Sequence, residues 1–140
     1  MEQLIEFAMN HWILLLSFIV VTGVLIYNLT LGDKGSVEPI TATDLINHQE
    51  AVVVDVRPAA DFHKGHIINA INIPGNGFAN QMGVLSKYKD KPIIVSCRSG
   101  AQSSSACQQL KKAGYEQVYN LKGGILAWQS ANLPITRKKK

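Results

Sequence analysis

The chain has 140 residues, a formal net charge of +4 and two cysteines. This length suits one domain of ordinary size. The two cysteines form no C-x-x-C pair, and no His/Cys cluster has the spacing of a zinc site. This excludes a disulfide framework and a structural zinc site and agrees with a reducing compartment. The basic residues are not interleaved with aromatic ones, so we expect no nucleic-acid partner.

An apolar helix is predicted near the N-terminus. From residue 7 through residue 32 the chain contains no Asp, Glu, Lys or Arg. A helix of roughly 20 apolar residues crosses the hydrocarbon core of a bilayer. Trp12 and Tyr27 lie near the ends of the stretch, where interfacial aromatic residues are common. The sequence therefore predicts one transmembrane helix over residues 12–31, with the membrane as a partner.

A cleaved signal peptide and a buried soluble helix are the alternatives to a membrane anchor. Glu2 and Glu6 precede the apolar stretch, no basic residue does, and no A-x-A cleavage site follows it. These points favour an uncleaved anchor. Lys34 follows the helix while no Lys or Arg precedes it, which favours a cytoplasmic position for the rest of the chain.

The chain is therefore divided into five parts. These are a short N-terminal segment, the helix, a linker, a globular domain and a basic tail, over residues 1–11, 12–31, 32–36, 37–134 and 135–140. The tail is interpreted as a solvated end, with attraction to an anionic membrane leaflet as the alternative.

Within the domain, strands and helices are predicted to alternate. Strands are predicted over residues 37–40, 51–56, 70–73, 92–96 and 117–119. Helices are predicted over residues 41–49, 59–64, 78–88, 102–113 and 125–129, the first of them opened by a capping box from Thr41 to Asp44. This alternation predicts an α/β domain with a parallel sheet covered on both faces.

Cys97 is the candidate catalytic residue. It follows an apolar β-branched run and precedes the Ser/Gly-rich loop 98–102 and a predicted helix. In this position backbone N–H groups and the positive end of a helix converge on the sulfur, lower its pKa and make it a nucleophile. A buried, inert cysteine is the alternative, which the loop composition disfavours. The candidate substrate-binding residues are those of the loop, namely Arg98, Ser99, Gly100, Ala101 and Gln102.

Two charged residues follow the neighbouring strand and are candidates for supporting the site. Asp55 is expected to support the site by bonding either the loop N–H groups or Arg57. A role in proton transfer is disfavoured, because the negative charge of a carboxylate beside the sulfur would repel a thiolate. Arg98 either contacts an anionic substrate or points to solvent.

The remaining candidate residues are assigned structural roles. His66 is interpreted as a structural histidine rather than a general base, and Cys107 as a core residue rather than a resolving thiol. Trp128 and Tyr119 are also assigned to the core.

Residues 37–134 resemble the rhodanese (sulfurtransferase) homology domain. The upstream matching block is Asp55-Val56-Arg57, Asp61-Phe62-His63-Lys64-Gly65-His66-Ile67, Ala70 and Ile73-Pro74. The downstream block is Cys97-Arg98-Ser99-Gly100, Lys112-Ala113-Gly114-Tyr115, Val118-Tyr119-Asn120-Leu121 and Gly123-Gly124-Ile125-Leu126-Ala127-Trp128. The combination of one anchor and one domain is similar to small membrane-attached bacterial members of this family, which implies the inner (cytoplasmic) membrane.

The resemblance implies a three-layer α/β/α domain with a five-stranded parallel sheet. It also implies that Cys97 accepts sulfane sulfur from a small donor, thiosulfate or a persulfide, and passes it to a thiol or cyanide-like acceptor. No cofactor and no metal are implied.

Two positions depart from the family pattern. Gln102 stands where the family often has an arginine, which weakens the case for a small dianion such as thiosulfate as donor, and Asn69 stands where glycine is usual. A related phosphatase would need arginine at Ser103, so a phosphatase is disfavoured. The main alternative is a non-catalytic module of this fold that binds a partner protein, such as a membrane protein, at the membrane.

Overall fold

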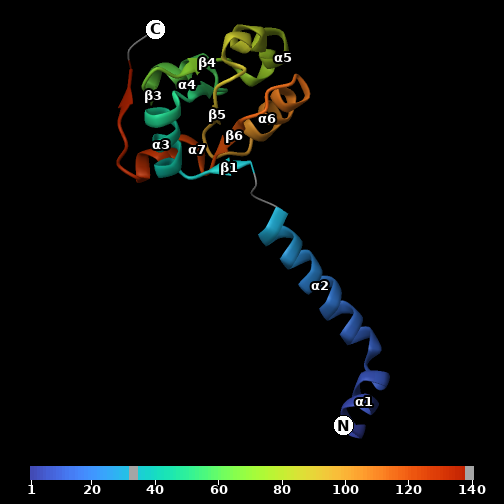
Figure 1. The fold of residues 1–140 in the computed structure, drawn as a ribbon. Coiled ribbons are helices and arrows are strands. Elements are labelled where there is room, and N and C mark those ends of the chain that lie inside the picture. The colour runs from blue at the N-terminus through green and yellow to red at the C-terminus, as the bar shows by residue number, and fades with distance from the viewer. Residues whose placement is uncertain (32–34, 138–140) are drawn as a thin grey trace. The chain divides into compact units, whose positions relative to one another are not determined.

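The computed structural model of the chain describes residues 1–31 and 35–137 (Figure 1). The chain divides into two compact units, one that ends at Lys34 and one that begins at Gly35. Each unit is described by itself.

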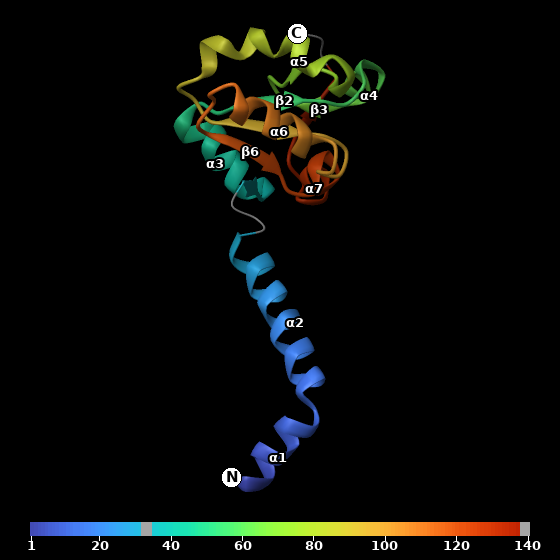
Figure 2. The same ribbon diagram turned by 90° about the vertical axis from the view of Figure 1, so that its right-hand side faces the viewer.

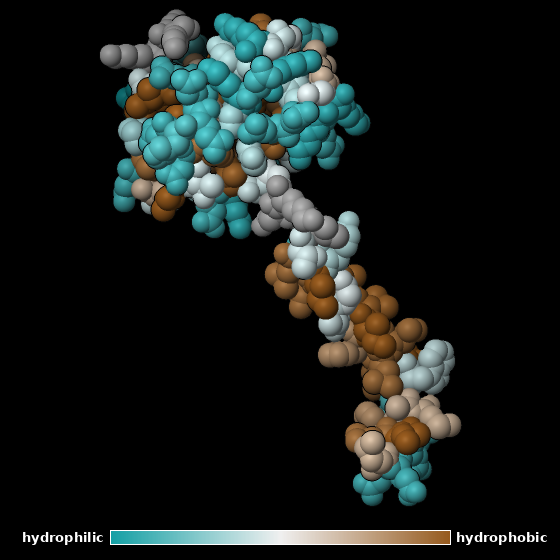
Figure 3. All heavy atoms as spheres, in the orientation of Figure 1, coloured by the Kyte–Doolittle hydropathy of each residue, from teal (hydrophilic) through white to brown (hydrophobic). Residues whose placement is uncertain are grey.

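The first unit consists of helices α1 (Glu2–Asn10) and α2 (Trp12–Leu31). The bounds of α2 match the predicted helix over residues 12–31, whereas α1 was not predicted. Helix α2 is long and apolar enough to cross a membrane, and brown, hydrophobic side chains surround it in Figure 3. The polar side chains of Ser17, Asn28 and Thr30 hydrogen-bond carbonyls within the helix at 2.8–2.9 Å. These bonds remove polar groups that an apolar medium would leave unsatisfied.

The second unit is an α/β domain built on a five-stranded parallel sheet. Its strands lie in the order β1-β6-β5-β2-β4, and every neighbouring pair is parallel. The strands are β1 (Ser36–Val37), β2 (Val52–Asp55), β4 (Ile71–Asn72), β5 (Ile93–Ser96) and β6 (Val118–Leu121). The predicted fold class and strand number are confirmed.

Helices cover both faces of this sheet, as Figures 1 and 2 show. One face carries α3 (Pro39–Gln49), α4 (Ala59–Lys64) and α7 (Gly124–Ser130), and the other carries α5 (Phe78–Gln81), α6 (Ser103–Lys112) and the 3-10 helix η2 (Met82–Tyr88). In β5, Ile93 and Val95 pack on the α6 face and Ile94 packs on the α7 face, all with 0% exposure. A strand buried on both faces needs an uninterrupted apolar run, which is why this strand was recognisable from the sequence.

The predicted strand over residues 37–40 is wrong in its second half. Helix α3 begins at Pro39, and Glu38 is its extended N-cap residue. Proline suits the first helical position because its missing N–H needs no partner there. The predicted capping box is also wrong, because Thr41 lies inside α3, whose N-cap is Glu38 and has no side-chain capping bond.

The predicted helix over residues 78–88 is divided. Only Phe78–Gln81 is α-helical and Met82–Tyr88 is a 3-10 helix. Gly83 lies in this second segment and lowers its α-helical propensity. A short 3-10 turn, η1 (Gly75–Gly77), precedes it.

A second, small sheet extends the domain beyond its predicted end. Strand β3 (His66–Ile67) pairs antiparallel with β7 (Ile135–Thr136). The predicted start of a free tail at residue 135 is therefore wrong, and Gly35 and Ser36 of the predicted linker also belong to the domain. Residues 32–34 of that linker and 138–140 of the tail lie outside the described residues.

Trp128 and Tyr119 belong to the core, as predicted. Trp128 is 4% exposed, and its Nε1–H donates to the Pro134 carbonyl at 2.9 Å. Tyr119 packs against the same core cluster. The bond from Trp128 ties α7 to the segment that leads into β7.

Candidate active site

Cys97 lies directly after β5, at the carboxyl end of the sheet between β2 and β6. The Cys97 residue is 1% exposed to solvent. The loop after it turns back over the sulfur, so that the Gly100 N–H donates to Sγ at 2.9 Å. Gly100 has a φ of +98°, a conformation that side chains disfavour. The loop predicted around Cys97 therefore forms, and its glycine is needed for the turn.

Several donors converge on this sulfur. Burial raises the pKa of the Cys97 thiol, but hydrogen bonds from the Ser103 side chain and from the backbone N–H groups of Ser103, Gly100 and Ser99 lower it further than burial raises it. Helix α6 begins at Ser103 and points its positive end in the same direction. The pKa of Cys97 thus lies below its ordinary value, and more thiolate is present at neutral pH than for an ordinary cysteine.

The Ser103 hydroxyl contacts three polar groups. Its Oγ lies 3.4 Å from Cys97 Sγ and 3.1 Å from the Gly100 carbonyl, and it also bonds Asn120 Oδ1. The Asn120 amide donates from Nδ2 to the Gly100 carbonyl at 2.9 Å. A carbonyl only accepts, so this bond fixes the orientation of the amide and turns Oδ1 toward Ser103.

The network gives Ser103 two roles at the sulfur. While Cys97 is a thiol, the hydroxyl donates to a carbonyl of the network and accepts from the S–H group. When Cys97 ionises, the sulfur becomes a charged acceptor, and a charged acceptor is preferred over a neutral carbonyl. The hydroxyl then donates to the thiolate and stabilises it.

Asp55 and Arg57 form a buried pair at the end of β2. The Arg57 backbone N–H and guanidinium donate to the Asp55 carboxylate, with a closest N–O distance of 2.7 Å, and Nη2 also donates to the Gly65 carbonyl at 2.7 Å. Asp55 lies beside Ser96, the residue before Cys97, in the sheet register. Of the two partners expected for Asp55, the structure shows Arg57. The pair holds the turn after β2 next to the strand that carries the cysteine.

Gly124 lets α7 approach the backbone of the site. Its φ is +59°, and a Cβ added there would lie 2.6 Å from the Arg98 carbonyl carbon and would also collide with the Cys97 carbonyl oxygen. The Ile125 N–H donates to that same Cys97 carbonyl at 2.8 Å. The turn before α7 therefore packs directly against the backbone of Cys97 and Arg98 and supports the loop there.

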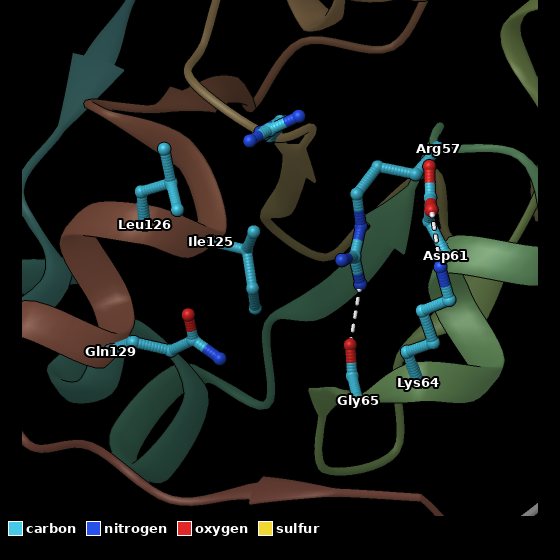
Figure 4. A pocket seen from close by; sticks show the side chains of 8 residues that line it. Arg57, Asp61, Lys64, Gly65, Ile125, Leu126 and Gln129 are labelled. Atoms are coloured by element: carbon cyan, nitrogen blue, oxygen red, sulfur yellow. Dashed lines mark hydrogen bonds and ion pairs between the residues drawn. The ribbon is translucent and has the colours of Figure 1, made fainter.

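The loop residues face different surroundings. Arg98 and Ser99 are exposed, and the Ala101 carbonyl accepts from the Ser104 hydroxyl at 2.9 Å. Arg98 lines a pocket of about 180 Å³, in which Ile125, Leu126 and Gln129 of α7 face Arg57, Asp61, Lys64 and Gly65 (Figure 4). Gln102 is the N-cap residue of α6 and lines a separate hollow of about 670 Å³. The loop thus separates a pocket at Arg98 from a hollow at Gln102.

Ser103, Asn120 and Gly124 were not predicted as parts of the site. Ser103 entered the prediction only as the position at which a related phosphatase would need arginine. A hydroxyl at the start of the following helix is nevertheless well placed to reach the sulfur. Asn120 lies near the end of β6, next to β5. A polar residue at that end of a neighbouring parallel strand was the available signal.

Three other interpretations agree with the structure. His66 is 2% exposed, stacks on Phe62 at 3.7 Å and bonds the Phe62 carbonyl through Nδ1, as a structural histidine does. Cys107 is in the core, where burial raises the pKa of its thiol to about 11. Asn69 has a φ of +64°, which explains why it stands where glycine is usual.

Comparison with known proteins agrees with this geometry. The Rhodanese-like domain family matches residues 39–131. The chain belongs to the rhodanese family. It is 41% identical to the uncharacterised protein YibN of Escherichia coli, over 99% of this chain and 100% of that protein. It is 34% identical to the thiosulfate sulfurtransferase GlpE of Shewanella oneidensis, over 69% of this chain and 97% of that protein.

A solved structure shows the same fold. The rhodanese-related protein of Thermoplasma volcanium superposes with a TM-score of 0.67 at 27% identity and covers 74% of this chain and 98% of its own. The match to YibN extends over the N-terminal unit as well as the rhodanese domain, in agreement with the expected layout of one apolar helix and one domain.

Ser103→Ala should make Cys97 less reactive at neutral pH. Loss of the hydroxyl removes a donor to the thiolate, raises the pKa of Cys97 and moves the pH profile of alkylation to higher pH. We expect alkylation of the full chain in detergent by iodoacetamide to be about five- to tenfold slower at neutral pH. Ser104→Ala is the matched control, because the Ser104 hydroxyl donates to Ala101 and not to the sulfur. An unchanged profile in Ser103→Ala would contradict the role of the hydroxyl.

Gly124→Ala should destabilise the domain far more than Gly83→Ala. The first substitution forces the loop away from α7, whereas a Cβ at Gly83 meets nothing within 4 Å. We expect a loss of about 2–4 kcal/mol for Gly124→Ala and a change within about 0.5 kcal/mol for Gly83→Ala. Urea unfolding followed by Trp128 fluorescence, with Trp12→Phe in every variant, measures both. Equal effects of the two substitutions would show that the close approach at Gly124 is unimportant.

Proposed function

We propose that this rhodanese protein is a membrane-anchored sulfurtransferase that carries sulfane sulfur as a persulfide on Cys97. The observation that supports it most is the convergence of the Gly100 amide, the Ser103 hydroxyl and the start of α6 on one sulfur atom. Such an arrangement stabilises a thiolate before reaction and a negatively charged persulfide after it. Similarity to a protein named as a thiosulfate sulfurtransferase adds support.

The reaction has two steps. The Cys97 thiolate attacks the outer sulfur of the donor, a bond from Sγ to that sulfur forms, and the electron pair of the broken S–S bond leaves with the rest of the donor, which is sulfite when the donor is thiosulfate. A thiolate or cyanide acceptor then attacks the outer sulfur of the persulfide. The electron pair returns to Sγ and restores the Cys97 thiolate.

The other residues of the site hold the sulfur and its substrates. The backbone of Ser99, Gly100, Ala101 and Gln102 surrounds the transferred sulfur. Arg98, which is exposed, attracts anionic groups toward the loop by its charge. The pair of Asp55 and Arg57 supports the loop through β2.

A non-catalytic rhodanese module that binds a partner protein is the second candidate. Two observations favour it: Cys97 is 1% exposed, and Gln102 replaces a guanidinium that would bind a dianion. Substrate access then requires movement of groups around the sulfur, whereas a binding module requires none.

Sulfur transfer is tested by intact mass of the full chain in detergent after treatment with thiosulfate and, separately, with an organic persulfide. We expect a gain in mass of one sulfur atom, which dithiothreitol removes. Cys97→Ser should abolish this gain. Cys107→Ser is the matched control and should retain it, because the Cys107 thiol is buried and its pKa is raised to about 11. If neither donor adds sulfur to the wild-type chain, the binding module is the better description.

We also propose that α2 anchors the protein in the inner membrane with the rhodanese domain in the cytoplasm. Its 20 residues span about 30 Å as a helix, the thickness of a hydrocarbon core. The internal hydrogen bonds of its polar side chains suit that medium. The orientation rests on Lys34, which follows the helix, and on the absence of Lys and Arg before it.

Anchoring is tested by fractionation in a bacterial host. The full chain should stay in the membrane pellet after an alkaline carbonate wash and retain Met1 in its intact mass. Val20→Lys with Val21→Lys should shift it to the soluble fraction, because each charge at a helix centre disfavours insertion by about 3 kcal/mol. Val20→Leu with Val21→Leu is the control. Loss of the N-terminal residues would indicate a signal peptide, and a reporter after Lys140 that is active only in the periplasm would reverse the orientation.

A further inference from the structure

The two hollows beside the Cys97 loop differ in charge. The smaller has cationic side chains in its lining, among them Lys64 and Arg98. Among the described residues, the lining of the larger, of about 670 Å³, includes no charged residue. Its wall comes from the segments after β2 and β4 and from the start of α6, and includes Val56, Pro58, Ala59, Asn76, Gln102 and Ser105. It offers apolar surface, amides and a hydroxyl, but no counter-ion.

The sulfur shares a face of the sheet with the larger hollow. Cys97 belongs to the core cluster on the α6 face together with Val56, which also lines the larger hollow. Ile125, which lines the smaller pocket, belongs to the cluster on the opposite face. Arg98 lines the smaller pocket and is absent from the residues that line the larger hollow, whereas Gln102 of the same loop lines the larger hollow. A donor that reaches Sγ from the larger hollow therefore does not pass Arg98.

We propose that the larger hollow is the donor site and that the donor is an organic hydropersulfide, R–S–SH, with an uncharged R group. The proposal rests on the proposed sulfurtransferase function and names its substrate class. Thiosulfate would bring two negative charges into a hollow without a cation, next to a thiolate, and such desolvation is unfavourable. A volume of about 670 Å³ also lies in the range of small-molecule sites and exceeds what a small inorganic anion fills.

The step balances with one negative charge throughout. The Cys97 thiolate attacks the outer sulfur of R–S–SH. A bond from Sγ to the outer sulfur forms, and the S–S bond of the donor breaks. The electron pair leaves on the donor sulfur, which takes the proton of the transferred group. The products are R–SH, free to leave the hollow, and the anionic persulfide on Cys97, which the loop amides stabilise.

The charge of the hollow is tested with the full chain in detergent. The donors are thiosulfate and the hydropersulfide of N-acetylcysteine methyl ester, and the readout is the rate constant of sulfur addition to Cys97 by mass. Gln102→Arg should raise the thiosulfate constant about tenfold or more, the worth of one charge-assisted hydrogen bond. The ratio of the thiosulfate constant to the hydropersulfide constant should therefore rise, because the added guanidinium pairs with the dianion and not with an uncharged R group. Gln108→Arg, which adds the same charge on exposed α6 surface outside the lining, should change neither constant.

The position of the donor is tested by filling each hollow in turn. Ala59→Trp places an indole in the larger hollow and should slow the hydropersulfide reaction about tenfold or more. Leu126→Trp fills the smaller pocket and should leave that rate constant unchanged. Unfolding midpoints equal to wild type show that both variants are folded.

The outcomes separate this inference from the function on which it rests. If Leu126→Trp slows the reaction and Ala59→Trp does not, the donor uses the smaller pocket and the inference is wrong. It is also wrong if sulfur is added but Gln102→Arg does not increase the use of thiosulfate. If neither donor adds sulfur to the wild-type chain, the proposed function itself fails.

Discussion

The hydrogen bond from the Gly100 N–H to the Cys97 sulfur is the interaction on which the site depends. It exists only while the loop keeps its turn, and that turn needs a positive φ at Gly100, the Asn120 amide on the Gly100 carbonyl and the close approach of Gly124 from below. Each support comes from a different part of the chain. The reactivity of one thiol is therefore a property of the whole carboxyl edge of the sheet rather than of a short motif.

Charge is distributed unevenly around that edge. The Arg57 guanidinium is held by the Asp55 carboxylate and the Gly65 carbonyl, so it supports the turn after β2. Arg98 is exposed on the α7 side of the loop. In the part of the chain that the structure describes, no cation lines the hollow on the α6 side. This arrangement agrees with glutamine at position 102 in place of the arginine that is frequent in the family, because a glutamine leaves this hollow without a side chain that pairs with a dianion.

Much of the fold was predictable because its signals are local or periodic. The uninterrupted apolar run of β5, the composition of α2 and the bounds of α4 needed no knowledge of distant residues. The errors arose where tertiary pairing decides the outcome. The small sheet of β3 and β7 joins two-residue strands that are too short to be periodic, and its partners are far apart in the chain. At Pro39, fixed backbone geometry favoured the first turn of a helix over the strand that the sequence before it suggested.

The sequence by itself determined the family, the fold class, the apolar helix and the identity of the candidate nucleophile, because each depends on residue type and spacing along the chain. Only the tertiary structure decided that the Ser103 hydroxyl contacts both Asn120 and the sulfur, that Gly124 supports the loop, and that Arg98 and Gln102 face different hollows. These features depend on which strands are neighbours and on which face of the sheet each side chain lies. Such relations arise from pairing between distant segments and are not present in any single stretch of residues.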